Sequence, residues 1–78
     1  KTNGGVVVRR VVLRIDMLMD RYGLNQGEFA EKVGIRPAAI SQLSRNHVVR
    51  ISIDHLERIV NTFEIDDIRE IIEIENIR

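Results

Sequence analysis

The sequence predicts an all-α domain of five helices, and its two ends have the composition of short β-strands. The chain has 78 residues, which is enough for one small domain. Apolar residues recur at spacings of three and four over most of its length, as on one face of a helix. There is no cysteine, so neither a disulfide nor a cysteine metal site supports the fold. A helical core, or a dimer, must therefore stabilise it.

The domain is expected to cover residues 6–78 as a single unit. Residues 1–5 are interpreted as a flexible N-terminal segment or a remnant of cloning, outside the fold. The opening KTNGGVVVRR lacks the apolar run and small-residue cleavage site of a secretory signal. No run of about 18 apolar residues exists, so no membrane-spanning helix is predicted. A cytoplasmic location is the expectation that fits these features.

The first two helices are predicted at about 12–22 and about 26–33. Gly23 is placed to end the first helix with a left-handed residue, and Gly34 to end the second. Asn25 and Glu28 have the spacing of a capping box at the start of the second helix. The apolar face of the first helix consists of Ile15, Leu18, Met19 and Tyr22, and that of the second of Phe29, Ala30 and Val33.

The third helix is predicted to begin at Pro37, because proline is tolerated in the first turn of a helix. It runs to about Arg45, with Ile40 and Leu43 facing inward. The segment SRNHVVR that follows is predicted to be a loop. Asn46 is the residue there that best tolerates a positive φ.

The fourth helix is predicted to open at Ser52 as its N-cap and to end near Phe63. A short fifth helix is predicted to start near Asp66. Beyond it, Ile72, Ile74 and the intervening glutamates alternate as in a strand. Residues 6–8 are valines, so the two ends are predicted to pair, within one chain or across a dimer.

Charge is divided unevenly along the chain, although the formal net charge is zero. Residues 1–50 hold nine Lys and Arg against four Asp and Glu, whereas residues 51–78 hold three against eight. A basic face can attract phosphate while an acidic end points away from it. An accidental split in a small protein would give the same numbers.

The segment from residue 26 to 45 has the spacing of a helix-turn-helix. Ala30 is small where two helices must approach closely, and Gly34 follows four residues later to turn the chain. Ile40 and Leu43 then anchor the next helix to the core. In such a motif the second helix enters the major groove of DNA.

The run YGLNQGEFAEKVGIRPAAISQLSRN, followed by VVRISIDHLERIVNTFEI, resembles the Cro/CI (Xre-type) family of helix-turn-helix regulators, in its small single-domain branch. The resemblance covers about residues 12–72. It implies a five-helix, lambda-repressor-like domain of bacterial or phage type. It also implies operator binding to double-stranded DNA as a homodimer, transcriptional control such as repression, and no cofactor.

The resemblance assigns DNA contacts residue by residue. Gln26 matches a glutamine that holds a phosphate at the start of the second helix, and a helix N-terminus is itself an anion site. Gln42 matches a position that reads a base, and glutamine pairs bidentately with adenine. The candidates for base or groove contact are Arg36, Pro37, Ala38, Ala39, Ser41 and Gln42.

The sequence departs from the family pattern after the inner leucine, where many relatives have Glu-x-Gly. The residues present here are candidates for extra phosphate contacts from the loop, namely Arg45, Asn46, His47 and Arg50. Small residues at the front of the third helix make direct base readout sparse. Simple surface exposure is the alternative for every one of these side chains.

The C-terminal region holds more isoleucines than a core of this size needs. The candidates for a homodimer interface are Ile68, Ile71, Ile72, Ile74 and Ile77, with an ordinary core role as the alternative. No spacing of metal ligands, phosphate loop or catalytic set is present, so neither an enzyme nor a small-molecule site is predicted. Two other functions stay open: a protein-interaction module, such as an antitoxin or a partner of another regulator, and a weakly specific accessory DNA binder.

Overall fold

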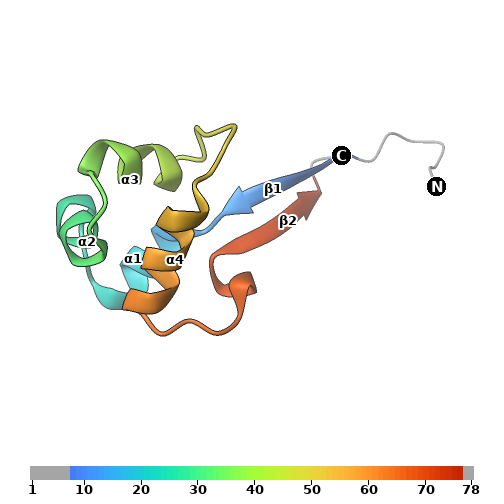
Figure 1. Ribbon diagram of the computed structural model, residues 1–78. Helices are drawn as coiled ribbons and strands as arrows, with labels where there is room; N and C mark the ends of the chain where they lie inside the picture. Colours follow the sequence, from blue (N-terminus) through green and yellow to red (C-terminus); the bar gives the residue numbers. More distant parts are fainter. Residues whose placement is uncertain (1–7, 77–78) are drawn as a thin grey trace.

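The computed structural model describes residues 8–76, which form a helical body and a two-stranded ribbon that extends from it (Figure 1). The body contains α1 (Ile15–Tyr22), α2 (Gln26–Val33), α3 (Pro37–Ser44) and α4 (Ile53–Thr62). The ribbon pairs β1 (Arg9–Leu13) with β2 (Ile72–Asn76), and the 3-10 turn η1 (Ile68–Glu70) precedes β2. None of the helices in this part of the chain is long and apolar enough to cross a membrane.

Local sequence signals mark the C-terminal ends of α1 and α2 and the N-terminal ends of α2 and α4. Gly23 and Gly34 end α1 and α2 in the left-handed conformation, with φ of 64° and 73°. The side chain of Asn25 accepts from the N–H of Glu28, whose own side chain accepts from the N–H of Asn25, so the predicted capping box is present. Ser52 caps α4 by accepting from the N–H of His55.

The prediction of a fifth helix is wrong for the described residues. Only the single 3-10 turn η1 forms there, because the chain is extended again from Ile72 to pair with β1. Asp67 caps this turn by accepting from the N–H of Arg69 at 3.0 Å. The described fold is therefore a four-helix domain with a two-stranded sheet.

The first helix begins at Ile15, three residues later than predicted. Val12 and Leu13 belong to β1 instead, where β-branched and large apolar side chains suit the paired strand. The predicted pairing of the two chain ends occurs within one chain and is antiparallel, with Val11 opposite Ile74 and Leu13 opposite Ile72. The N-terminal strand is shifted from residues 6–8. Val8 lies just before it, and residues 6–7 lie outside the described residues, as does the N-terminal segment 1–5.

The core lies between the four helices and the base of the ribbon. Phe29 is fully buried and stacks on Phe63, with ring centroids 5.4 Å apart. The ring of Tyr22 also packs on Phe63, with a centroid distance of 4.6 Å. Ile71 is also fully buried, although it adjoins the ribbon. The fully buried large side chains are Phe29, Ile15, Leu18, Ile40, Ile59 and Ile71. This core holds α2 and α3 in a fixed arrangement.

Candidate nucleic-acid interface

Helices α2 and α3 form a helix-turn-helix whose turn is fixed by backbone bonds. The N–H groups of Gly34 and Ile35 both donate to the carbonyl of Ala30, at 2.9 and 3.0 Å. Gly34 has a positive φ, and a Cβ at this position would lie 3.1 Å from the guanidinium of Arg58. Ala30 is 1% exposed, as close helix packing requires. The turn therefore sets the orientation of α3.

Helix α3 buries one side and presents the other. Ile40 and Leu43 are in the core, whereas Ala38 and Gln42, one turn apart, are exposed to solvent. Pro37 occupies the first helical turn, and the N-cap Arg36 makes no capping bond with its side chain. The exposed face of α3 thus offers one long amide side chain, that of Gln42, between small residues.

Two of the predicted groove residues are less accessible than the others. Ala39 is half-buried and packs against the core, so only part of its methyl group is accessible to a ligand. Ser41 is half-buried too, and its hydroxyl accepts a hydrogen bond of 2.7 Å from Arg45. This bond holds the Arg45 guanidinium alongside α3.

Gln26 lies in the first turn of α2 and contacts the end of α3. Its side-chain amide donates to the hydroxyl of Ser44 at 3.1 Å, and that hydroxyl donates to the carbonyl of Ser41 at 3.0 Å. The N–H groups of Gln26 and Gly27 are in the first helical turn, where no intrahelical acceptor exists. Such N–H groups, at the positive end of the helix dipole, form a binding site for a phosphate oxygen.

A shallow pocket of about 230 Å³ runs beside α3 and brings together Gln42, Arg50 and His55. His47 and Arg50 are exposed in the loop after α3. His55 was not among the residues predicted for this surface. The sequence signal that could have placed it here is its position in the first turn of α4, directly after the loop. The pocket joins the exposed face of α3 to the basic loop.

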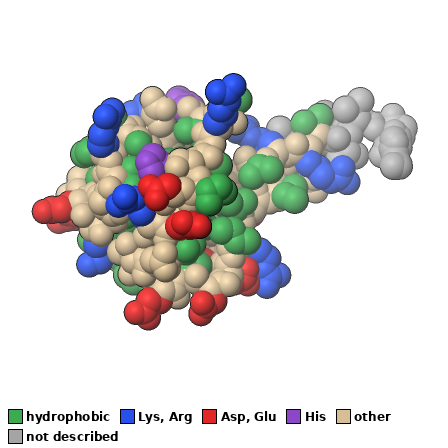
Figure 2. Space-filling model, viewed as in Figure 1, with side chains coloured by type: hydrophobic (Ala, Val, Ile, Leu, Met, Phe, Trp, Pro, Cys, Tyr) green, Lys and Arg blue, Asp and Glu red, His purple; other side chains and the backbone are tan. Residues whose placement is uncertain are grey.

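The surface charge is arranged around this face. In Figure 2, Lys and Arg side chains stand along the upper rim of the body, where Figure 1 places α3 and the loop after it. Asp and Glu side chains lie at mid-height and lower on the body in the same view, with further Lys and Arg side chains among them. The upper rim is therefore basic on this face, whereas the rest of it carries both signs of charge.

Asn46 differs from the other loop candidates because its side chain faces inward. Its φ is 60°, in the left-handed region, as the sequence indicated. Its amide oxygen accepts from the N–H of Leu13 at 2.6 Å, and its amide nitrogen donates to the carbonyl of Leu13 at 3.1 Å. These bonds join the loop to β1.

The five isoleucines predicted for a dimer interface have different environments. Ile71 is fully buried in the core of its own chain, so the structure supports a core role for this residue and not an interface role. Ile72 is half-buried, whereas Ile68 and Ile74 are exposed, and Ile77 lies outside the described residues. Of the four isoleucines that the structure describes, Ile68 and Ile74 are the two with exposed side chains.

A family model for the Cro/C1-type HTH DNA-binding domain matches residues 14–76 of the chain. No curated protein and no solved structure shows a significant match. The matched range spans all four helices and β2, including the turn at Gly34 and the exposed face of α3. The chain belongs to the Cro/C1-type HTH DNA-binding domain family.

Proposed function

We propose that this protein is a sequence-specific transcriptional regulator that binds operator DNA as a homodimer. Helix α3 enters the major groove, and the first turn of α2 and the loop after α3 bind the flanking phosphates. The observation that supports this most strongly is the geometry of α3, whose inner side is anchored by Ile40 and Leu43 while Gln42 projects from the body. Helices of this motif read DNA with such a face.

Gln42 is the residue to which we assign direct base readout. Its exposed amide can donate and accept at once, which matches the N6 and N7 edge of adenine. Arg36 stands at the start of α3, and the exposed surface of Pro37 and Ala38 allows close approach of the backbone to the groove. An alanine methyl group can also contact the methyl group of thymine.

Phosphate contacts come from two segments that adjoin α3. Gln26 and the N–H groups of the first turn of α2 supply one set, and Arg45, His47 and Arg50 in the loop after α3 supply the other. These contacts supply affinity that does not depend on base sequence but falls as salt rises.

Homodimer formation is assigned to the outer part of the ribbon. Val11 and Ile74 lie directly opposite each other and are 67% and 68% exposed, so they form one apolar surface. Ile68 adds to the exposed apolar surface near the base of β2. A two-fold protein dimer matches a two-fold operator.

Selection from a random pool of duplex DNA tests the proposal directly. We expect enrichment of a motif with two half-sites separated by one helical turn or a multiple of it. The variant Gln42→Ala should relax preference at one position of each half-site and cost roughly 1–3 kcal/mol there. Enrichment without any motif would favour a weakly specific accessory binder, and absence of DNA binding would favour a protein-interaction module.

Salt titration separates the phosphate contacts from base readout. Arg50→Ala should weaken binding to all sequences alike and lower the salt slope by about 1. The control is Lys32→Ala, which removes the same charge from the last turn of α2, where Lys32 lines a pocket with Glu28 and Glu31. An equal effect of the two substitutions would contradict a specific role for the loop.

Sedimentation tests the dimer with a matched pair of isoleucines. Ile74→Lys places a charge on the ribbon, and Ile53→Lys places it on α4 at a site of nearly equal exposure, 68% against 65%. We expect only the first substitution to shift the protein towards monomer. A wild-type protein that stays monomeric at high concentration would contradict the dimer.

A further inference from the structure

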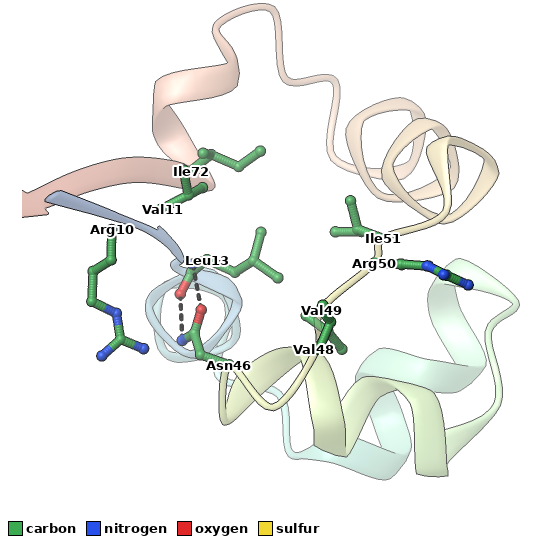
Figure 3. A pocket seen from close by; sticks show the side chains of 9 residues that line it. All are labelled: Arg10, Val11, Leu13, Asn46, Val48, Val49, Arg50, Ile51 and Ile72. Carbon is green, nitrogen blue, oxygen red and sulfur yellow. Dashed lines mark hydrogen bonds between the residues drawn. The ribbon is translucent and has the colours of Figure 1, made fainter.

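The side chain of Asn46 occupies the place of a third strand beside β1. Figure 3 shows its amide facing Leu13, with both hydrogen bonds drawn as dashed lines. An amide side chain has the same donor and acceptor as a peptide group, so it can satisfy both backbone groups of one strand residue. We call these two bonds the Asn46 clamp.

The clamp lies on the free edge of β1, opposite β2. Backbone groups of successive residues in an antiparallel strand point alternately to one side and the other. The N–H of Arg14 donates to the carbonyl of Ile71 on the β2 side, at 2.6 Å. The groups of Leu13 therefore point away from β2, where Asn46 meets them.

The location of the clamp connects the two functional parts of the molecule. Asn46 follows Ser44, the last residue of α3, by two positions, and Leu13 is the last residue of β1. The loop that Asn46 begins also lines a pocket of about 340 Å³ with Val11 and Ile72 of the ribbon. The end of the recognition helix is thus bonded directly to the base of the ribbon.

We infer that Asn46 is a positioning residue that fixes the ribbon relative to α3 and thereby limits the operator to one half-site spacing. The inference rests on the proposed binding of DNA by a dimer formed through the ribbon. In such a dimer, the distance between the two recognition helices depends on the angle at which each ribbon leaves its body. A two-stranded ribbon has little stability of its own, so its direction depends on the contacts at its base.

The clamp also redefines the role of Asn46 within the loop. Its amide oxygen and nitrogen both bond to Leu13, and its side chain is half-buried, unlike those of Arg45, His47 and Arg50. We therefore assign Asn46 to the placement of α3 rather than to a phosphate contact.

Asn46→Gly is the variant that isolates the clamp. Glycine adopts a φ of 60° without strain, so the loop keeps its backbone conformation while both side-chain bonds are lost. Asn46→Asp provides a second variant, because aspartate also tolerates positive φ and retains the acceptor for the N–H of Leu13 but not the donor.

The position of the ribbon is measured without DNA by the distance between two spin labels. The chain has no cysteine, so Ala38→Cys on α3 and Asn76→Cys on β2 provide unique sites. Dilution with unlabelled protein removes distances between the subunits of a dimer. We expect a narrow distribution of label-to-label distances in the protein that keeps Asn46, a broad distribution in Asn46→Gly and one of intermediate width in Asn46→Asp. An unchanged distribution in Asn46→Gly would overturn the inference.

Spacing preference is then measured on operators selected with the wild-type protein, with one or two base pairs added between the half-sites. Asn46→Gly should keep the preferred bases but lose about tenfold in discrimination between spacings, equivalent to roughly 1.4 kcal/mol. Equal spacing preference in both proteins would refute the role of the clamp while leaving the proposed function intact. A wild-type protein that selects no paired half-sites would refute the proposed dimer instead, and the spin-label result would stand independently.

Discussion

The helical body and the ribbon are built by different kinds of interaction. Several helix ends of the body are set by residues that act over three or four positions, such as the capping box of Asn25 and Glu28. The ribbon pairs residues at the two ends of the chain, with Arg9 opposite Asn76. In the outer part of the ribbon the apolar side chains are exposed, 67% for Val11 and 68% for Ile74. The outer part of the ribbon is therefore expected to contribute little to the stability of the body, and to depend on its attachment and its partner.

The largest expected effect is the loss of an aromatic side chain from the core. Phe29→Ala removes a fully buried ring that stacks on Phe63, and it should lower the free energy of unfolding by about 3–5 kcal/mol. Val11→Ala, on the exposed ribbon, should change it by no more than about 0.5 kcal/mol in the monomer. Urea denaturation at low protein concentration measures both, and similar losses would contradict the division between body and ribbon.

A second comparison tests the attachment of the ribbon. Ile71→Ala removes a fully buried side chain at its base and should cost about 2–5 kcal/mol. Ile74→Ala lies three residues further along and is 68% exposed, so its effect on the monomer should be within about 0.5 kcal/mol. Amide exchange in β1 and β2 should accelerate in the first variant. Retained protection there would mean that the ribbon is held by other contacts.

A smaller effect is expected at the turn between α2 and α3. Gly34→Ala forces a residue with a Cβ into a φ of 73° and should cost about 1–2 kcal/mol. Its control is Gly27→Ala in the first turn of α2, where φ is not positive and the nearest atom to a Cβ is 3.5 Å away. That change should be neutral or stabilising, by up to about 1 kcal/mol. Thermal denaturation distinguishes the opposite signs.

The smallest expected effect is a dependence on acid at the turn that precedes β2. The side chain and then the backbone N–H of Arg69 lower the pKa of Asp67 from 3.8 to about 2. Because the folded pKa is depressed, this contribution to stability is fully present above the unfolded pKa. It is lost as pH falls through about 2.

Carboxyl chemical shifts measure this titration directly. We expect a midpoint near 2 for Asp67 in the folded protein, and a flatter acid limb of the stability curve in Asp67→Asn. A midpoint at the ordinary value would show that the bond with Arg69 does not persist in solution.

The sequence predicted the body well because its signals are local. Gly23, Asn25, Gly34 and Ser52 act within one helical turn, so the helix ends that they mark could be assigned without knowledge of the fold. The alternation after Ile71 also indicated a strand. The helix-turn-helix and the family followed from the same local pattern.

The errors arose where distant residues decide the structure. Val12 and Leu13 fit the apolar face of a first helix, yet pairing with Glu73 and Ile72 makes them part of β1. The same pairing ends η1 after one turn. For Asn46, the positive φ was readable from residue type, but its bonds to Leu13 span 33 positions of sequence. No local pattern identifies such a partner.

The hydrogen bond between Gln26 and Ser44 fixes the direction of an exposed side chain before any ligand arrives. It uses one of the two N–H groups of the Gln26 amide and leaves the other for a further acceptor. If Gln26 binds phosphate as proposed, less side-chain freedom is lost on binding. Replacing Ser44 by alanine would release the amide, and on this account the variant would bind phosphate less readily than the natural protein.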